Sequence, residues 1–149
     1  MDAEDDRSLF WRIKRYQEIQ EKQAIGLRKR YLMSGFSGGA IRGAYVGVSS
    51  APARYAGARE GGYSKAFAME VIRSIRTDLD AFSEVEQGVL MNHGYALIDA
   101  ALRTHVPELL EADGAFAWPA PEFAPSAMPE EALRRRMAGC EKRKLTGRG

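Results

Sequence analysis

The amino-acid sequence predicts a mainly α-helical fold with one short β-strand. Three stretches carry apolar residues at three- and four-residue steps, which is the period of an amphipathic helix. One stretch, GAYVGV at residues 43–48, is apolar and partly β-branched, as strands are. Because a lone strand leaves its backbone groups unpaired, a complete sheet is not expected within these 149 residues.

Composition excludes several classes of protein. The hydrophobic fraction of 45% and the charged fraction of 28% are typical of a globular domain. No run of 18 apolar residues is present, and the start MDAEDDRSLF lacks the apolar region of a secretory signal. Cys140 is the single cysteine, so no internal disulfide can form. We therefore expect a cytoplasmic chain, with peripheral membrane contact as a variant of that location.

Residues 6–33 are predicted to form one long helix, because they contain no proline and only one glycine. Ser34 and Gly35 are expected to stop it. Two glutamines make its best face only moderately apolar, and such a face needs a partner surface. That face comprises Phe10, Ile13, Tyr16, Gln17, Gln20, Ala24, Leu27 and Tyr31.

Two further helices are predicted after the strand and a loop at residues 49–63. The first spans residues 64–76. The second begins at Ser83, because Ser83 and Glu86 have the spacing of a capping box, and Pro107 marks its end.

The last predicted helix has two sides. Its apolar side is predicted to hold Leu90, Met91, Gly94, Tyr95, Leu97, Ile98, Ala101 and Leu102. Asn92, Asp99 and Arg103 lie on the other side and are candidates for docking or polar contacts. Asp99 and Arg103 have the spacing of an i,i+4 ion pair. A solvated face is the competing interpretation of this polar side.

The predicted organisation is an acidic N-terminus at residues 1–5, a helical region at 6–112 and a tail at 113–149. The tail is rich in proline and basic residues and is expected to be mobile, with helical turns at residues 130–137. Arg28, Lys29 and Arg30 form a second basic cluster, which could contact an anionic surface. For each cluster taken alone, a solvated helix face or a disordered tail is the preferred interpretation, and no aromatic–basic pattern indicates specific nucleic-acid binding.

Three motifs in one order resemble the C-terminal segment of bacterial patatin-like phospholipases. They are QAIGLRKRYLMSGF at 23–36, GAYVGV at 43–48, and IRTDLDAF with VLMNHGYALIDAALR at 75–82 and 89–103. Val46 and His93 stand where the family pattern has tryptophan. The resemblance implies the C-terminal helical portion of a three-layer α/β lipid acyl hydrolase, truncated or diverged, and not a complete sheet.

That family uses a Ser-Asp dyad, with a G-x-S-x-G elbow and a glycine-rich oxyanion loop, all upstream of the matched segment. A serine needs a base and preorganised amide donors to attack an ester. Partial imitations occur here at Gly38 and Gly39, at Ser49, and at Asp113. Only ten residues separate Gly39 from Ser49, which is too few for a parallel crossover. We therefore expect no catalytic residue, and a miniature esterase using Ser49 is an alternative.

No cofactor or metal site is predicted. His93 and His105 are twelve residues apart on or near one helix, about three turns, which is too far to share an ion. The expected partners are a patatin-like α/β catalytic domain or a second copy of the chain. A binding module that uses the basic helix on anionic lipid or on another protein is the remaining alternative.

Overall fold

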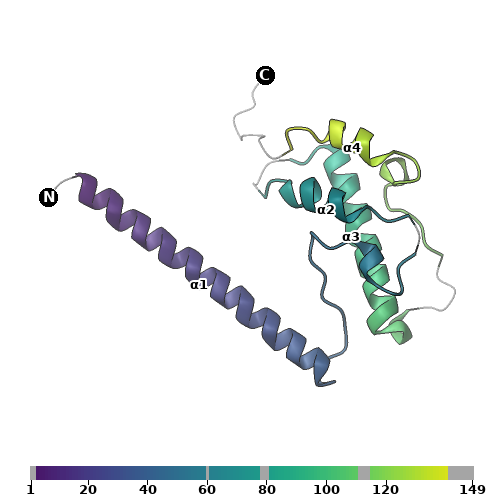
Figure 1. The fold of residues 1–149 in the computed structure, drawn as a ribbon, viewed down its shortest axis with the longest axis horizontal. Coiled ribbons are helices and arrows are strands. Elements are labelled where there is room, and N and C mark those ends of the chain that lie inside the picture. The colour runs from purple at the N-terminus through teal and green to yellow at the C-terminus, as the bar shows by residue number, and fades with distance from the viewer. Residues whose placement is uncertain (1–2, 60, 78–80, 111–114, 141–149) are drawn as a thin grey trace. The chain divides into compact units, whose positions relative to one another are not determined.

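The computed structural model describes residues 3–59, 61–77, 81–110 and 115–140, with side chains described from residue 9 onward. It contains four α-helices in these ranges: α1 (Ala3–Ser37), α2 (Lys65–Glu70), α3 (Glu84–His105) and α4 (Glu130–Arg136). The chain divides into two compact units, Met1–Arg42 and Gly43–Gly149, and each is described by itself (Figure 1). The mainly helical prediction is thus confirmed.

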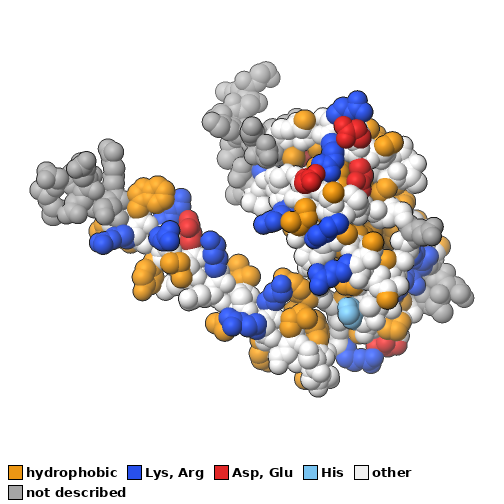
Figure 2. Space-filling model, in the orientation of Figure 1, with side chains coloured by type: hydrophobic (Ala, Val, Ile, Leu, Met, Phe, Trp, Pro, Cys, Tyr) orange, Lys and Arg blue, Asp and Glu red, His pale blue; other side chains and the backbone are white. Residues whose placement is uncertain are grey.

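The first unit is the single long helix α1 and the turn that ends it. At 1.5 Å per residue, its 35 residues span about 50 Å. No side chain between Leu9 and Ser37 is buried, and apolar and basic groups alternate along the helix (Figure 2). The helix ends beyond the predicted residue 33, because the Gly38 amide bonds to the Ser34 carbonyl and Gly39 takes a left-handed φ of 71°.

The predicted strand is wrong. Among the described residues the structure contains no strand, and residues 43–48 run as an irregular segment. The physical reason is that a strand needs a neighbour to pair its backbone groups, and the described residues contain no second strand. Side chains instead hold the end of this segment: His93 bonds to the Val48 carbonyl and Lys65 to the Ser49 carbonyl.

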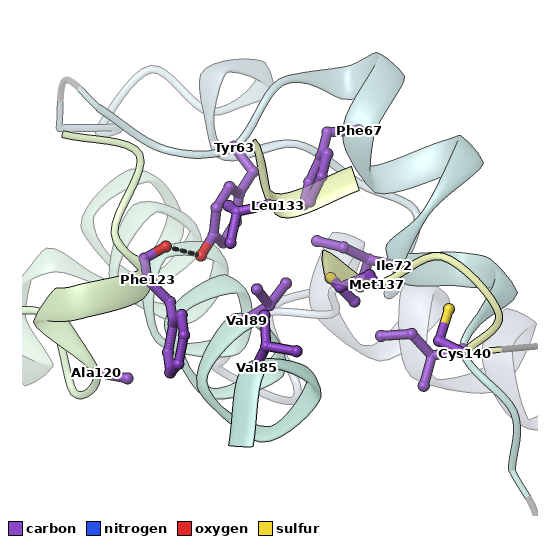
Figure 3. Close-up of a cluster of buried hydrophobic side chains, with 11 residues drawn as sticks. Tyr63, Phe67, Ile72, Val85, Val89, Ala120, Phe123, Leu133, Met137 and Cys140 are labelled. Atoms are coloured by element: carbon purple, nitrogen blue, oxygen red, sulfur yellow. Dashed lines mark hydrogen bonds between the residues drawn. The ribbon is translucent and has the colours of Figure 1, made fainter. Parts of the chain in front are cut away.

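The second unit is built around α3, with α2, α4 and short 3₁₀ helices packed beside it (Figure 1). Ser83 caps α3 with the predicted capping box, and α3 ends before Pro107 as expected. The predicted helix at residues 64–76 is shorter than expected: α2 stops at Glu70 and a 3₁₀ turn, Ile72–Ser74, follows. Figure 3 shows side chains from all three α-helices pointing toward one core.

Residues 115–140, in the segment predicted to be a tail, contribute side chains to the core of the second unit. Phe123, Leu133, Met137 and Cys140 are all buried in the same core as Phe67 and Val89 (Figure 3). Proline sets the bends of this segment, at the first turn of the 3₁₀ helix Pro121–Phe123 and just before α4. The helical turns expected at residues 130–137 are confirmed as α4.

Candidate functional site

The polar side chains that the sequence singled out on α3 lie at two different depths. Asn92 is completely buried and His93 is 2% exposed, whereas Asp99 and Arg103 lie part-way to the surface. The predicted apolar side of α3 is confirmed only in part, since Leu97 and Ala101 are buried whereas Met91, Tyr95 and Ile98 are exposed. The buried side also includes Val85, Val89, Asn92, His93, Ala96 and Ala100.

Asn92 fastens the C-terminal segment to α3. Its amide nitrogen donates to the Ala120 carbonyl at 2.7 Å, and its amide oxygen accepts from the Ala120 N–H at 2.9 Å. The amide of an asparagine side chain can bond to one backbone donor and one backbone acceptor at the same time. Tyr63 adds a second link, because its hydroxyl donates to the Phe123 carbonyl at 2.6 Å (Figure 3). Burial, as the largest cause, raises the pKa of Tyr63 to about 12.

His93 fastens the segment before the first 3₁₀ helix. Its Nε2 lies 2.8 Å from the Val48 carbonyl, so Nε2 carries the proton and donates. The other ring nitrogen, Nδ1, is buried with no hydrogen-bond partner. Burial lowers the pKa of His93, and the bond to Val48 offsets this only in part. The ring is therefore neutral near pH 7 and acts as a structural donor.

A buried ion pair supports the start of α3. Arg76 and Glu86 are 2.6 Å apart, and each side chain is 3% exposed. Arg76 also donates to the carbonyls of Cys140 and Ala81. Burial by itself would raise the pKa of Glu86, but hydrogen bonds from Ser83 and the charge of Arg76 outweigh it and lower that pKa. This group joins the N-terminus of α3 to the end of the α4 segment.

Asp99 and Arg103 form the predicted ion pair, with Arg103 Nε 3.0 Å from both carboxylate oxygens. Arg59 lies 3.5 Å from the same carboxylate and stacks over the Phe116 ring. These three side chains thus satisfy one another within the unit. Asp99 and Arg103 were candidates for docking contacts, and the structure gives them an internal ion pair.

Each described residue that imitates a serine hydrolase lies in a local turn of its own unit. The amides of Gly38 and Gly39 bond to the Ser34 and Phe36 carbonyls, so both donors close the end of α1. Ser49 lies half-buried in a turn of the second unit, followed by the 3₁₀ helix Pro52–Arg54 and no α-helix. A nucleophile elbow needs a strand before the serine and a helix after it. Asp113 lies outside the described residues.

The remaining candidates are dispersed. Arg28, Lys29 and Arg30 are exposed on α1, and Arg30 Nε donates to the Gly26 carbonyl. His105 is exposed at the end of α3 and meets Tyr55 edge-on, whereas His93 is buried.

Within the described ranges, no three His, Cys, Asp or Glu side chains come together as a metal site. None of the described helices has the length and apolar character required to cross a bilayer.

Sequence reasoning missed the most consequential surface of the second unit. Met91, Tyr95 and Ile98 are 51%, 41% and 43% exposed on one side of α3. Their spacing of four and three residues was visible, but it was assigned to the core. The signal that could have corrected it is the string Val85, Val89, Ala96 and Ala100, which defines a second apolar side on the same helix. We call Met91, Tyr95 and Ile98 the outer face of α3.

Neither a protein-family model, nor a curated protein, nor a solved structure matches this chain.

Proposed function

We propose that this chain is a non-catalytic binding module: the C-terminal part of a patatin-like lipid acyl hydrolase, which completes an α/β catalytic domain without supplying a Ser-Asp dyad. The sequence motifs at residues 23–36, 43–48 and 75–103 support the choice of family. The observation that carries the binding role is the outer face of α3. A helix whose other side is already packed keeps three large apolar side chains that are 41–51% exposed, although the Tyr95 ring also contacts the Phe116 ring at 5.2 Å.

The internal polar network favours a module over an enzyme. Asn92, His93 and Glu86 are the most buried polar groups of α3, and each is committed to a backbone or an arginine of this chain. A catalytic group must reach a substrate, so these groups are scaffold. They make the second unit stiff enough to present its outer face as a fixed surface.

Reconstitution tests this function. A patatin-like α/β catalytic domain, expressed without its own C-terminal segment, is titrated with the full chain, and binding and ester hydrolysis are measured together. We expect a complex, and we expect Met91→Glu or Ile98→Glu to weaken it by about tenfold or more, because each places a charge in an apolar contact. Leu109→Glu is the matched control, since Leu109 is 65% exposed in the same unit but off α3.

Absence of binding, or equal weakening by Leu109→Glu, would refute the module. The competing function is the miniature esterase that uses Ser49. Purified wild type and Ser49→Ala are compared on short- and long-chain acyl esters. We expect neither to hydrolyse them, and activity lost in Ser49→Ala would overturn the proposal in favour of an enzyme.

A further inference from the structure

The long helix α1 presents an uncharged stripe that its own unit leaves uncovered. We call this the central stripe: Leu9, Ile13, Tyr16, Gln20, Ala24, Leu27 and Tyr31. All seven side chains are exposed, and no charged residue lies among them. A lone helix in water gains little stability from its sequence and depends on packing of one face. We therefore expect another apolar surface to pack against the central stripe.

The spacing of the central stripe is symmetric about Gln20. Successive members are 4, 3, 4, 4, 3 and 4 residues apart, so the pattern is the same read in either direction. Two antiparallel copies of one helix, centred on Gln20, therefore bring every stripe residue opposite a stripe residue of the other copy. The opposed pairs are Leu9 with Tyr31, Ile13 with Leu27, Tyr16 with Ala24, and Gln20 with Gln20.

The side chains in these opposed pairs are complementary. Ile13 and Leu27 form a branched apolar pair, and the small Ala24 leaves room for the large Tyr16 ring. Gln20 meets its own copy at the centre, where each amide can donate one hydrogen bond and accept one. A single polar pair of this kind within an apolar seam fixes register.

The charges at the two ends of α1 select the antiparallel direction. Residues 2–6 carry four carboxylates, and Arg28, Lys29 and Arg30 carry three positive charges near the other end. A parallel pair would set like charges side by side. An antiparallel pair brings the acidic N-terminal segment of one chain toward the end of α1 that carries the basic cluster of the other, so unlike charges are opposed. The helix dipoles are also opposed. One contact in the antiparallel pair is unfavourable, because Arg12 approaches the like charge of Arg30 of the second copy.

We propose that α1 pairs with α1 of a second copy in an antiparallel two-helix interface centred on Gln20. This goes beyond the proposed module, which binds its partner through the outer face of α3. Each protein would thus present two surfaces with different occupants. The pairing makes a definite statement about which residues meet, so it can be tested one position at a time.

Disulfide trapping tests the register. Full-length chains carry Cys140→Ala to remove the native thiol, and one new cysteine each. Gln20→Cys is expected to form a covalent dimer by itself. Leu9→Cys and Tyr31→Cys are expected to remain monomeric alone and to cross-link when mixed. Glu18→Cys, on the opposite side of α1, is the control and should stay reduced. Self-linking of Leu9→Cys equal to the mixture would mean a parallel pair and overturn the proposal.

Sedimentation equilibrium of the full chain tests the occupant. Leu27→Glu is expected to raise the dimer dissociation constant about tenfold or more, because it buries a charge in the seam. Ile25→Glu is the control, since Ile25 is 62% exposed against 61% for Leu27 but points to the other side of α1. A monomer at every concentration, or equal effects of both variants, refutes pairing. A monomer that binds vesicles containing anionic lipid would instead assign the stripe to a membrane surface.

Discussion

Asn92 and Ala120, 28 residues apart, are joined by two hydrogen bonds in opposite directions, at 2.7 and 2.9 Å. One fully buried amide therefore satisfies both backbone groups of Ala120 and leaves neither to water. The contact locates the whole C-terminal segment, because Phe123 enters the core three residues later. A residue that the sequence placed on a polar face is thus a central structural link of the second unit.

Asn92→Ala is expected to destabilise the chain by about 2–4 kcal/mol, because it strands a buried donor and a buried acceptor of Ala120. Urea unfolding of the second unit, followed by tryptophan fluorescence of Trp118, measures the loss. Gln87→Ala is the control, since Gln87 donates one exposed hydrogen bond to the Phe82 carbonyl. A loss no larger than that of Gln87→Ala would contradict the role assigned to Asn92.

Two glycines on α3 should respond in opposite directions to alanine. A Cβ at Gly88 would lie 2.1 Å from Cδ2 of Phe123, so we expect Gly88→Ala to cost about 1–3 kcal/mol in spite of its better helix propensity. A Cβ at Gly94 meets nothing within 4 Å, so Gly94→Ala should stabilise by about 0.5–1 kcal/mol. Thermal unfolding of the two variants shows the signs, and a stabilising Gly88→Ala would rule out the close approach of Phe123.

The burial of His93 makes stability depend on pH. Its pKa is lowered below 6.5 in the folded state. Above pH 6.5 the ring is neutral in both the folded and the unfolded state, so its titration does not change the free energy of unfolding. As the pH falls below 6.5, the unfolded chain takes up a proton that the folded chain resists, so the free energy of unfolding decreases down to the folded pKa. Urea unfolding at several values between pH 5.5 and 7.5 should show this slope.

His93→Gln should flatten that slope, because glutamine has no proton to gain and keeps a donor near the Val48 carbonyl. His105→Gln, at the exposed histidine of the same helix, should leave it in place. A slope that survives His93→Gln would assign the pH dependence to another group.

The Arg76–Glu86 pair and the Arg134–Glu70 pair have nearly equal lengths, 2.6 and 2.7 Å, but very different exposure. Glu86→Gln should cost about 3–5 kcal/mol, because it leaves the buried Arg76 charge unbalanced. Glu70→Gln should cost less than about 1 kcal/mol, since the Glu70 side chain is 62% exposed. Equilibrium urea unfolding at pH 7 compares them, and equal losses would show that burial does not set the strength of this pair.

Acidic pH should also remove the stabilising contribution of Glu86 from the wild-type chain. The pKa of Glu86 is lowered on folding, so its stabilising effect is present above the unfolded value near 4.5 and is lost as the pH falls through the folded pKa. Glu86→Gln should lack this part of the acid-dependent loss. Unfolding curves between pH 3 and 5 make the comparison, and parallel losses in both proteins would contradict it.

Local chemistry made part of the fold predictable. Ser83 and Glu86 predict the start of α3, because the two residues of a capping box lie within four positions of each other. The end of α1 was predicted a few residues early, at Ser34 and Gly35, whereas the left-handed φ that closes the helix falls at Gly39. Asp99 and Arg103 pair as their spacing predicted.

What escaped prediction depends on contacts between distant residues. The side of α3 that becomes buried packs against Phe123 and Leu133, which come from segments that follow it in the chain. The mobile tail was predicted from the many prolines of this segment, but its few large apolar residues enter the core. The burial of Asn92 had no local signal, since its partner Ala120 lies 28 residues away in the chain.

The position of α4 in the chain has a consequence for the order of synthesis. Residues 63–106 emerge from the ribosome first, yet their core is closed by Leu133, Met137 and Cys140. Until those residues are made, Tyr63, Phe67 and Val89 lack the side chains that cover them. The nascent second unit therefore passes through an interval in which an apolar surface is open, and folding of this unit is completed only when α4 has left the tunnel.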